Sequence, residues 1–252
     1  MEDIELRYLG NKTRLSKELT PLLTKHLTGE NWYVEPFAGA FGMISNIHYS
    51  KRIAYDNDKY IIELMKAVRN GWSPPETLTE TEYINLKTLA SNGHVEPLIA
   101  FAGYGCSFGG KWFNGFARGG KTSRGEDRNH VAESARNLNK MRDKLQGIKI
   151  RLFDYKDAPL GVSNVIYADP LYVNCTKYKM KFNHEEFWEW CRNVAQNNFL
   201  YVSEYTAPSD FISIWSKEHK TGIHHGFKEH KQSTENLFVY SKTFAKEIRE
   251  GN

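Results

Sequence analysis

Short apolar runs alternate with helical patterns along much of the chain. Five runs rich in β-branched and aromatic residues predict strands at 32–35, 51–56, 148–153, 164–168 and 199–203. Leucines at 15, 19, 22, 23 and 27 recur at near-helical spacing, which predicts a first helix starting at Thr13. A helix-like segment from Met43, helices at 184–196 and 208–215, and a last strand at 237–240 are also expected. This alternation favours an α/β domain.

The middle of the chain has a different pattern. From Lys59 onward, helices are predicted at 60–69 and 81–90, separated by the breaker Gly-Trp-Ser-Pro-Pro at 71–75. An amphipathic helix is predicted at 127–146, with Gly147 in the position that commonly ends a helix. No strand pattern interrupts this region. The 252 residues therefore form one large domain or a domain carrying an insert.

The tetrad Asp169-Pro170-Leu171-Tyr172 follows the apolar run 165–168. Because proline cannot extend a central strand, the tetrad is expected in a loop at the carboxyl end of that strand, where open α/β sheets bind ligands. A carboxylate and a backbone carbonyl can each accept a hydrogen bond from one N–H of an exocyclic amine. An aromatic ring can stack on the nucleobase that carries this amine. By itself the tetrad favours an ordinary turn, because Asp-Pro after a strand is a common turn opener, and its value depends on the rest of the chain.

Two further strand ends carry candidate binding residues. The loop Glu35-Pro36-Phe37-Ala38-Gly39-Ala40-Phe41-Gly42 contains glycines that permit a tight turn and close approach to a ligand, although it is looser than G-x-G-x-x-G. Asp56 ends the next predicted strand about 20 residues on, where Rossmann-like sites place a carboxylate on a ribose hydroxyl. Alternatively, Asp56 caps the helix that begins near Asp58. Asp154-Tyr155 is another acid-aromatic pair at a strand end.

Residues 101–125 contain eight glycines interleaved with aromatic and basic residues, and do not resemble a core segment. Between 101 and 128, five basic residues face two acidic ones, a local charge of +3. Basic side chains neutralise phosphates and aromatic rings wedge or stack among bases, so a nucleic-acid surface is predicted. A solvated mobile loop is the alternative. The candidate DNA-contacting residues are Lys111, Trp112, Phe113, Asn114, Phe116, Arg118, Lys121 and Arg124.

Composition narrows the class of protein. No apolar run approaches the roughly 20 residues of a membrane span, and the acidic N-terminus lacks the features of a signal peptide. Three cysteines without a C-x-x-C pair suggest neither a disulfide framework nor a zinc site. The net charge of +4 permits a polyanionic partner. The histidines at 219, 224, 225 and 230 lack a carboxylate or cysteine at a standard ligand spacing, so no metal is expected.

The order of these motifs resembles the DNA adenine-N6 methyltransferases of the Dam-like class, the D12 class, of bacterial or phage origin. Tyr8-Leu9-Gly10-Asn11-Lys12 is similar to the family's aromatic-x-Gly-x-Lys element, and residues 35–42 are similar to its cofactor loop. Asp56 occupies the position of the family's acidic residue that binds the cofactor ribose. Asp154-Tyr155 occupies the position of the family's acid-aromatic pair beside the cofactor adenine. The tetrad at 169–172 stands where the family has Asp-Pro-Pro-Tyr. The resemblance covers nearly the whole chain.

The resemblance implies a Rossmann-like doubly wound α/β sheet with a mostly helical inserted recognition domain and β-hairpin. It assigns residues 1–59 and 148–252 to a catalytic domain and 60–147 to a target-recognition insert. S-adenosylmethionine would be the cofactor and S-adenosylhomocysteine the product, without a metal. The implied cofactor-binding residues are Tyr8, Lys12, Glu35, Pro36, Phe37, Gly39, Gly42, Asp56, Asp154, Tyr155 and Asp169. Asp169, Pro170, Leu171 and Tyr172 would be catalytic.

The implied reaction is methylation of N6 of an adenine flipped out of double-stranded DNA. The expected setting is the cytoplasm of a bacterium or phage-infected cell, as in restriction-modification, without membrane association and as a monomer or weak dimer. Leu171 departs from the family's second proline and favours a catalytically silent DNA-binding homologue as an alternative. An N4-cytosine or RNA methyltransferase is another alternative. The cytosine enzymes more usually carry serine at the first tetrad position, so Asp169 favours adenine.

Overall fold

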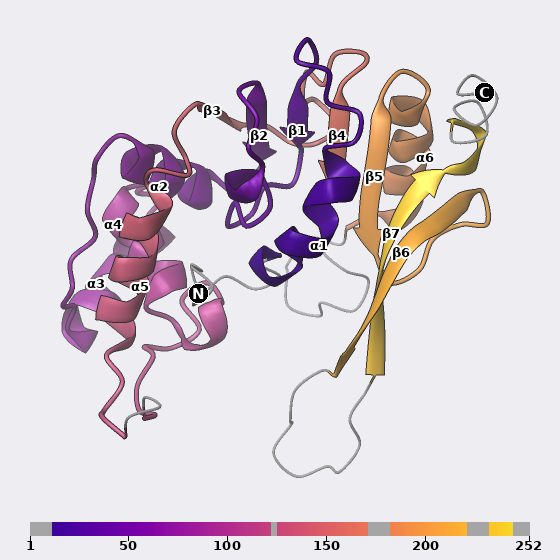
Figure 1. Cartoon of the computed structure of the whole chain (residues 1–252). Coiled ribbons are helices and arrows are strands. Elements are labelled where there is room, and N and C mark those ends of the chain that lie inside the picture. Colours follow the sequence, from indigo (N-terminus) through magenta and orange to yellow (C-terminus); the bar gives the residue numbers. More distant parts are fainter. Residues whose placement is uncertain (1–11, 122–124, 171–181, 221–231, 244–252) are drawn as a thin grey trace.

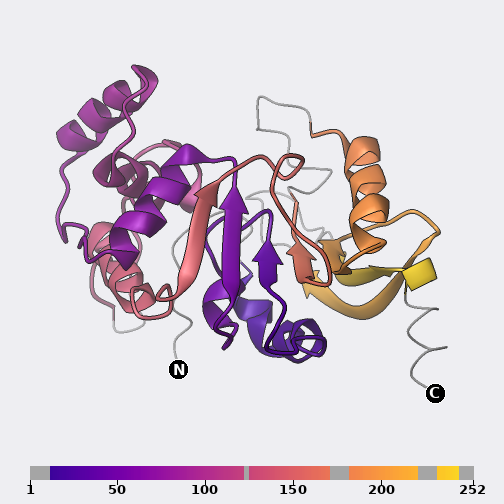
Figure 2. The same cartoon turned by 90° about the horizontal axis from the view of Figure 1, so that it is seen from above.

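A computed structural model describes residues 12–121, 125–170, 182–220 and 232–243. Its centre is a seven-stranded sheet with strand order β3-β2-β1-β4-β5-β7-β6 (Figures 1 and 2). The strands are β1 (Tyr33–Glu35), β2 (Arg52–Asp56), β3 (Ile148–Leu152), β4 (Val165–Ala168), β5 (Phe199–Glu204), β6 (Phe211–Lys220) and β7 (Gln232–Tyr240). β1 to β5 run parallel, and β7 is antiparallel to both of its neighbours. This is the predicted Rossmann-like α/β sheet.

The described helices are α1 (Thr13–Leu23), α2 (Lys59–Arg69), α3 (Glu80–Ser91), α4 (Pro97–Ala100), α5 (His130–Met141) and α6 (His184–Ala195). Shorter helical segments are Ile44–Asn46, Phe101–Gly105 and Phe108–Gly110. Helices α2 to α5 gather beside the β3 edge, at the opposite end of the sheet from β6 and β7 (Figures 1 and 2). All four lie between β2 and β3 in the sequence.

Alternating side chains give the sheet two apolar faces, because successive strand residues point to opposite sides. Tyr33 and Tyr167 belong to a core cluster with leucines 15, 19 and 23 of α1. Val34 and Ile166, one residue along each strand, belong to a second cluster with Phe187 and other residues of α6. The first cluster also contains apolar residues of α2 and α5, so the inserted helices share the core of the α1 face.

The structure corrects three of the predicted secondary-structure elements. The helix expected at 208–215 is wrong, because Phe211–Lys220 forms β6 and pairs antiparallel with β7. The helix expected at 127–146 is shorter, His130–Met141, and begins after Asn129, whose side chain accepts a hydrogen bond from the Ala132 amide. In place of the expected β-hairpin, the described part of 101–128 has isolated bridges that join Ser107 to Phe116 and Lys121 to Asp127.

Within the described ranges, none of the helices combines the length and the apolarity needed to span a bilayer.

Candidate functional site at the carboxyl edge of the sheet

Acidic residues lie at the carboxyl ends of four parallel strands. Glu35 ends β1, Asp56 ends β2, Asp169 follows β4 and Glu204 ends β5. Because these strands are parallel, their carboxyl ends meet at one edge of the sheet. Strand order reverses between β1 and β4, the place where doubly wound sheets bind ligands. The structure therefore brings the predicted acids to one edge.

Lys12 connects the segment before α1 to this edge. Its Nζ lies 2.9 Å from Oδ1 of Asp169 and 3.4 Å from Oε1 of Glu235 on β7. The exposed fractions of the Lys12, Asp169 and Glu235 side chains are 8%, 14% and 5%. Burial alone would lower the pKa of Lys12, but attraction to both carboxylates outweighs it and the pKa is raised. Lys12 is therefore held as a cation between two acids.

Burial also changes the titration of Asp169. It raises the pKa of the Asp169 carboxyl to about 7, with attraction to Lys12 opposing the shift and repulsion from Glu235 adding to it. Pro170, the next residue, is buried. Asp169 therefore titrates near neutral pH.

Two more buried carboxyl groups adjoin this cluster. Oε1 of Glu35 accepts a hydrogen bond from the Tyr33 hydroxyl at 2.8 Å, and burial raises the pKa of Glu35 well above its usual range. Oε2 of Glu204 accepts the Tyr205 amide at 2.7 Å. The other oxygen, Oε1, is buried and has no hydrogen-bond partner among the described residues. Burial raises the pKa of Glu204 to about 7.

Asp56 fixes the predicted cofactor loop to the end of β2. Its Oδ2 accepts the Gly39 amide at 2.8 Å, and its Oδ1 accepts the Asp58 amide at 2.9 Å. Gly39 has a φ of 48°, which glycine adopts readily. The alternative that Asp56 caps α2 is wrong, because Asp58 is the cap and its side chain accepts the amides of residues 60 and 61. Burial raises the pKa of Asp56 to about 6.

Aromatic rings form a wall beside the same loop. The centroids of Phe37 and Tyr155 lie 4.9 Å apart, and both rings contact Phe187 of α6. Oδ2 of Asp154 accepts a hydrogen bond from the Asn57 side chain at 3.2 Å, which links the ends of β3 and β2. Of the other predicted loop residues, Pro36 and Gly42 are buried. The loop and the acid-aromatic pair are thus neighbours, as a shared binding site requires.

The glycine-rich segment differs from expectation. Trp112 packs against Tyr60 and Tyr104, with ring centroids 4.3 Å and 4.8 Å away, and Phe113 is buried. Gly103 makes this packing possible, since a Cβ there would lie 2.2 Å from the Trp112 ring. Phe116 packs against Tyr83 of α3. The expectation that this stretch lies outside the core is therefore wrong for Trp112, Phe113 and Phe116, whereas Phe108 is 68% exposed.

Two basic residues of the segment, Arg118 and Lys121, face solvent next to acidic neighbours. Arg118 pairs with Glu80, and Lys121 Nζ lies 2.6 Å from Asp127. Lys111 is half-buried, and Asn114 is exposed. Arg118 and Arg128 pair with Glu80 and Glu133, which lie outside 101–128, so these acids partly balance the +3 of that stretch. Tyr8, Arg124, Leu171 and Tyr172, also predicted site residues, lie outside the described residues.

Sequence reasoning missed Glu204 and Glu235. Glu204 has the same signal that identified Asp56, an acid at the end of a β-branched and aromatic strand, and could have been found. Glu235 lies inside the antiparallel strand β7, where no local pattern marks it. The described residues contain no group of three or more acids, histidines and cysteines arranged to hold a metal ion.

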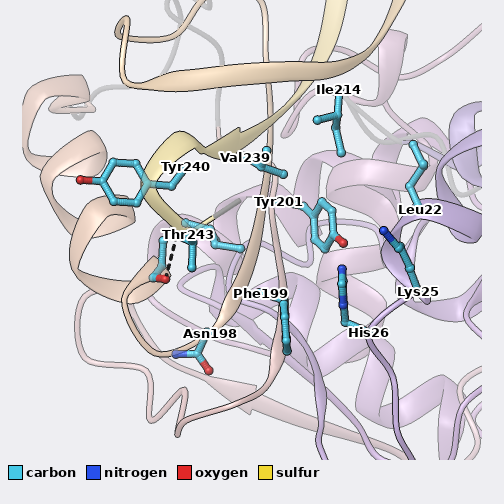
Figure 3. Close-up of a pocket in the computed structure, with 12 residues that line it drawn as sticks. Leu22, Lys25, His26, Asn198, Phe199, Tyr201, Ile214, Val239, Tyr240 and Thr243 are labelled. Atoms are coloured by element: carbon cyan, nitrogen blue, oxygen red, sulfur yellow. Dashed lines mark hydrogen bonds between the residues drawn. The ribbon is translucent and has the colours of Figure 1, made fainter. Parts of the chain in front are cut away.

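A cavity of about 200 Å³ lies elsewhere, at the amino end of β5 (Figure 3). Leu22, Tyr201, Ile214 and Val239 supply apolar walls, and His26 stacks on Phe199 with ring centroids 4.3 Å apart. Its lining includes none of the predicted site residues. It is smaller than the roughly 300–1,000 Å³ usual for a drug-sized ligand. The cavity is therefore separate from the acidic edge.

Comparison with known proteins supports the resemblance in the N-terminal third. Residues 8–93 match the family described as D12 class N6 adenine-specific DNA methyltransferase. No curated protein matches the sequence. Among solved structures, the chain is similar to SMU.472, a protein assigned as a methyltransferase and solved in complex with SAH, at 8% identity and a TM-score of 0.37. That match covers 92% of this chain and 53% of the other.

Proposed function

We propose that this protein transfers a methyl group from S-adenosylmethionine to N6 of adenine in double-stranded DNA. The observation that carries the proposal is the position of Asp169-Pro170, at the end of β4 beside the reversal of strand order. The family match over residues 8–93 supports the same reaction class. Identification of the methylated base after incubation with duplex DNA tests it.

The residues at the carboxyl edge suit this cofactor. The Phe37–Tyr155 wall offers apolar surface for an adenine ring, and Asp56 has lone pairs beyond the two that accept the Gly39 and Asp58 amides. The buried Oε1 of Glu204 suits a cationic or hydrogen-bond-donating group. We propose Lys12, Tyr8, residues 35–42, Asp154 and Asp169 as further binding residues. When bound, S-adenosylmethionine supplies an electrophilic methyl group on a sulfonium.

Asp169 and Pro170 would activate the amine. The lone pair of adenine N6 is delocalised into the ring, which makes the nitrogen a poor nucleophile. The Asp169 carboxylate and the Pro170 carbonyl would each accept one N6 hydrogen, favouring a tetrahedral nitrogen whose lone pair faces the methyl group. Tyr172 would stack on the flipped base, whose unstacking costs a few kcal/mol. Lys12 supports this role by stabilising the ionised form of Asp169.

We propose that residues 60–147 form the DNA-recognition insert on the catalytic scaffold 1–59 and 148–252. The exposed residues Arg118, Lys121 and Asn114, together with Lys111 and Arg124, would contact DNA. Arg118 and Lys121 exchange their acidic neighbours for phosphates when DNA binds. Trp112, Phe113 and Phe116 would approach the target from the packed core behind this surface.

Because leucine occupies position 171, we propose that this protein methylates slowly. A residue before proline is pushed into the extended region, so a proline at 171 would fix the direction of the Pro170 carbonyl. Leucine removes that restriction. The protein would then bind cofactor and DNA but methylate slowly, with a silent DNA-binding homologue as the limiting case.

A second candidate is methylation of N4 of cytosine or of RNA, since similar acceptors serve any exocyclic amine. Asp169 favours adenine. We further propose a monomer or weak dimer in the cytoplasm of a bacterium or phage-infected cell, with restriction-modification as the setting.

A further inference from the structure

Two carboxyl groups contact Lys12, and two more lie near them. Asp169 and Glu235 contact its Nζ at 2.9 Å and 3.4 Å. Glu204 lies close enough to Lys12, Asp169 and Glu235 for their charges to shift its pKa, and Asp169 likewise shifts the pKa of Glu35. These groups come from the ends of β1, β4 and β5 and from β7. The cluster therefore lies where the reacting centre of a bound cofactor is expected.

Glu204 gives an independent sign that the cluster receives a ligand. The residue is 1% exposed, and one of its oxygens accepts the Tyr205 amide. The other oxygen is buried without a hydrogen-bond partner in the described part of the chain. Buried polar groups are normally satisfied, and a buried charge is normally paired. A positively charged ligand would satisfy this oxygen.

We infer that Asp169, Glu204 and Glu235, whose charge Lys12 balances only in part, form an acidic cluster that binds the sulfonium of the cofactor in preference to the neutral thioether of the product. The inference rests on the proposed function. Methyl transfer breaks a carbon–sulfur bond, leaves its electron pair on sulfur and forms a carbon–nitrogen bond at N6. The nitrogen gains the positive charge and then loses a proton through Asp169 to solvent. Sulfur is then neutral, so the attraction of the acidic cluster to it is lost and product release is favoured.

Proton linkage makes this preference measurable. The pKa values of Asp169 and Glu204 are raised to about 7, so both groups exchange protons near neutral pH. A bound cation beside the acidic cluster stabilises their ionised forms, and its binding therefore releases protons. Binding of the product, whose sulfur is neutral, releases no such protons from these two groups. The charged and titratable groups that act on this cluster or belong to it are Lys12, Tyr33, Glu35, Arg52, Tyr167, Asp169, Glu204 and Glu235.

Titration calorimetry of the full chain with S-adenosylmethionine and S-adenosylhomocysteine, between pH 5.5 and 7.0, tests the inference. The ratio of their affinities should rise with pH, by up to about tenfold per pH unit for each proton released. An analogue with an ammonium in place of the methylsulfonium should behave like the sulfonium. Glu204→Gln and Glu235→Gln should flatten the dependence. Glu18→Gln removes an exposed carboxylate paired with Lys217 and should leave the ratio unchanged.

The outcomes separate this inference from the proposed function. Equal pH dependence for the two compounds in the wild-type protein would overturn the inference while leaving cofactor binding intact. Failure of both compounds to bind at every pH would instead reject the proposed function. Should either glutamine variant fail to fold, the wild-type series and the ammonium analogue still decide the question.

Discussion

Lys12 Nζ lies 2.9 Å from Asp169 Oδ1 and thereby joins the segment before α1 to the carboxyl end of β4. Both side chains are largely buried, so neither charge is well screened by solvent. The residue that would accept the adenine proton is thus tied to a residue far away in sequence. Changes at Lys12 should consequently alter the chemistry at Asp169.

Lys12→Met should raise the pKa of Asp169 further, because a neighbouring positive charge is lost. The methylation rate at pH 7 should fall by roughly ten- to a hundredfold, the equivalent of about 1.5–3 kcal/mol for a charged hydrogen bond. The acid limb of the rate profile should move to higher pH. Single-turnover rates at saturating cofactor check this, with Lys12→Arg as the charge-retaining control. An unmoved acid limb in the methionine variant would contradict the assignment.

The raised pKa values predict how stability depends on pH. The native pKa values of Asp56, Asp169 and Glu204, about 6, 7 and 7, exceed the usual carboxyl range. Between about pH 4 and 7 the native state therefore binds more protons through these groups than the unfolded state. Their contribution to the free energy of unfolding should fall as pH rises through this window.

Glu204→Gln isolates one of these groups. The variant should gain stability relative to wild type as pH rises from 5 to 8, by at most about 1.4 kcal/mol per pH unit. Urea unfolding at several pH values measures the difference. Parallel stability curves for the two proteins would show that Glu204 does not titrate with a raised pKa.

Asp56→Ala should weaken cofactor binding for two reasons. The variant loses the predicted ribose acceptor, and it also releases the Gly39 amide that positions the loop. A charged hydrogen bond contributes about 1.5–3 kcal/mol, so the affinity should drop roughly ten- to a hundredfold. Calorimetry with S-adenosylhomocysteine measures this. Asp58→Asn, which alters the cap of α2, is the control and should retain affinity.

Elements that depend on neighbouring residues in the sequence could be predicted, whereas elements that depend on distant strands could not. The run 165–168 followed by Asp-Pro marks a strand end by local chemistry, and β4 with Asp169 confirms it. The segment 208–215 misled because Pro208 begins it in the manner of a helix, with apolar residues such as Ile212 and Trp215 at helical spacing. Its pairing with β7 decides its structure, and that pairing is not local.

The aromatic residues near 112 show the same limit. Glycine density around Trp112 indicated an exposed loop, whereas its rings find partners in Tyr60 of α2 and Tyr104. Likewise, the role of Glu235 depends on Lys12, at the other end of the chain. The burial of Trp112 and the role of Glu235 depend on contacts between distant segments, which a local sequence pattern does not predict.

Removal of single basic residues should test the proposed DNA surface. Arg118→Ala and Lys121→Ala should each reduce the slope of log affinity against log salt by about 0.9, because each loses one phosphate contact. The slope is measured with a labelled duplex across a salt series. Lys25→Ala, at the separate cavity, should keep the parent slope. If both insert variants keep it too, the DNA surface lies elsewhere.

Leu171→Pro should raise the methylation rate without changing cofactor affinity. The lost backbone restriction is worth about 0.4–1 kcal/mol, roughly two- to fivefold in rate. Steric displacement of the reacting groups could enlarge the gain to about a hundredfold. Single-turnover rates of the two forms compare them directly. Equal rates would show that position 171 does not direct the Pro170 carbonyl.

The central claim is the reaction itself. Stoichiometric protein is incubated with methyl-labelled S-adenosylmethionine and mixed-sequence duplex DNA, with single-turnover sampling over long times because methylation is expected to be slow. The DNA is then digested to nucleosides, which are separated and counted. The proposed function predicts label in N6-methyladenine, abolished by Asp169→Ala. Label in N4-methylcytosine, or none in DNA from either the leucine or the proline form at position 171, would contradict it.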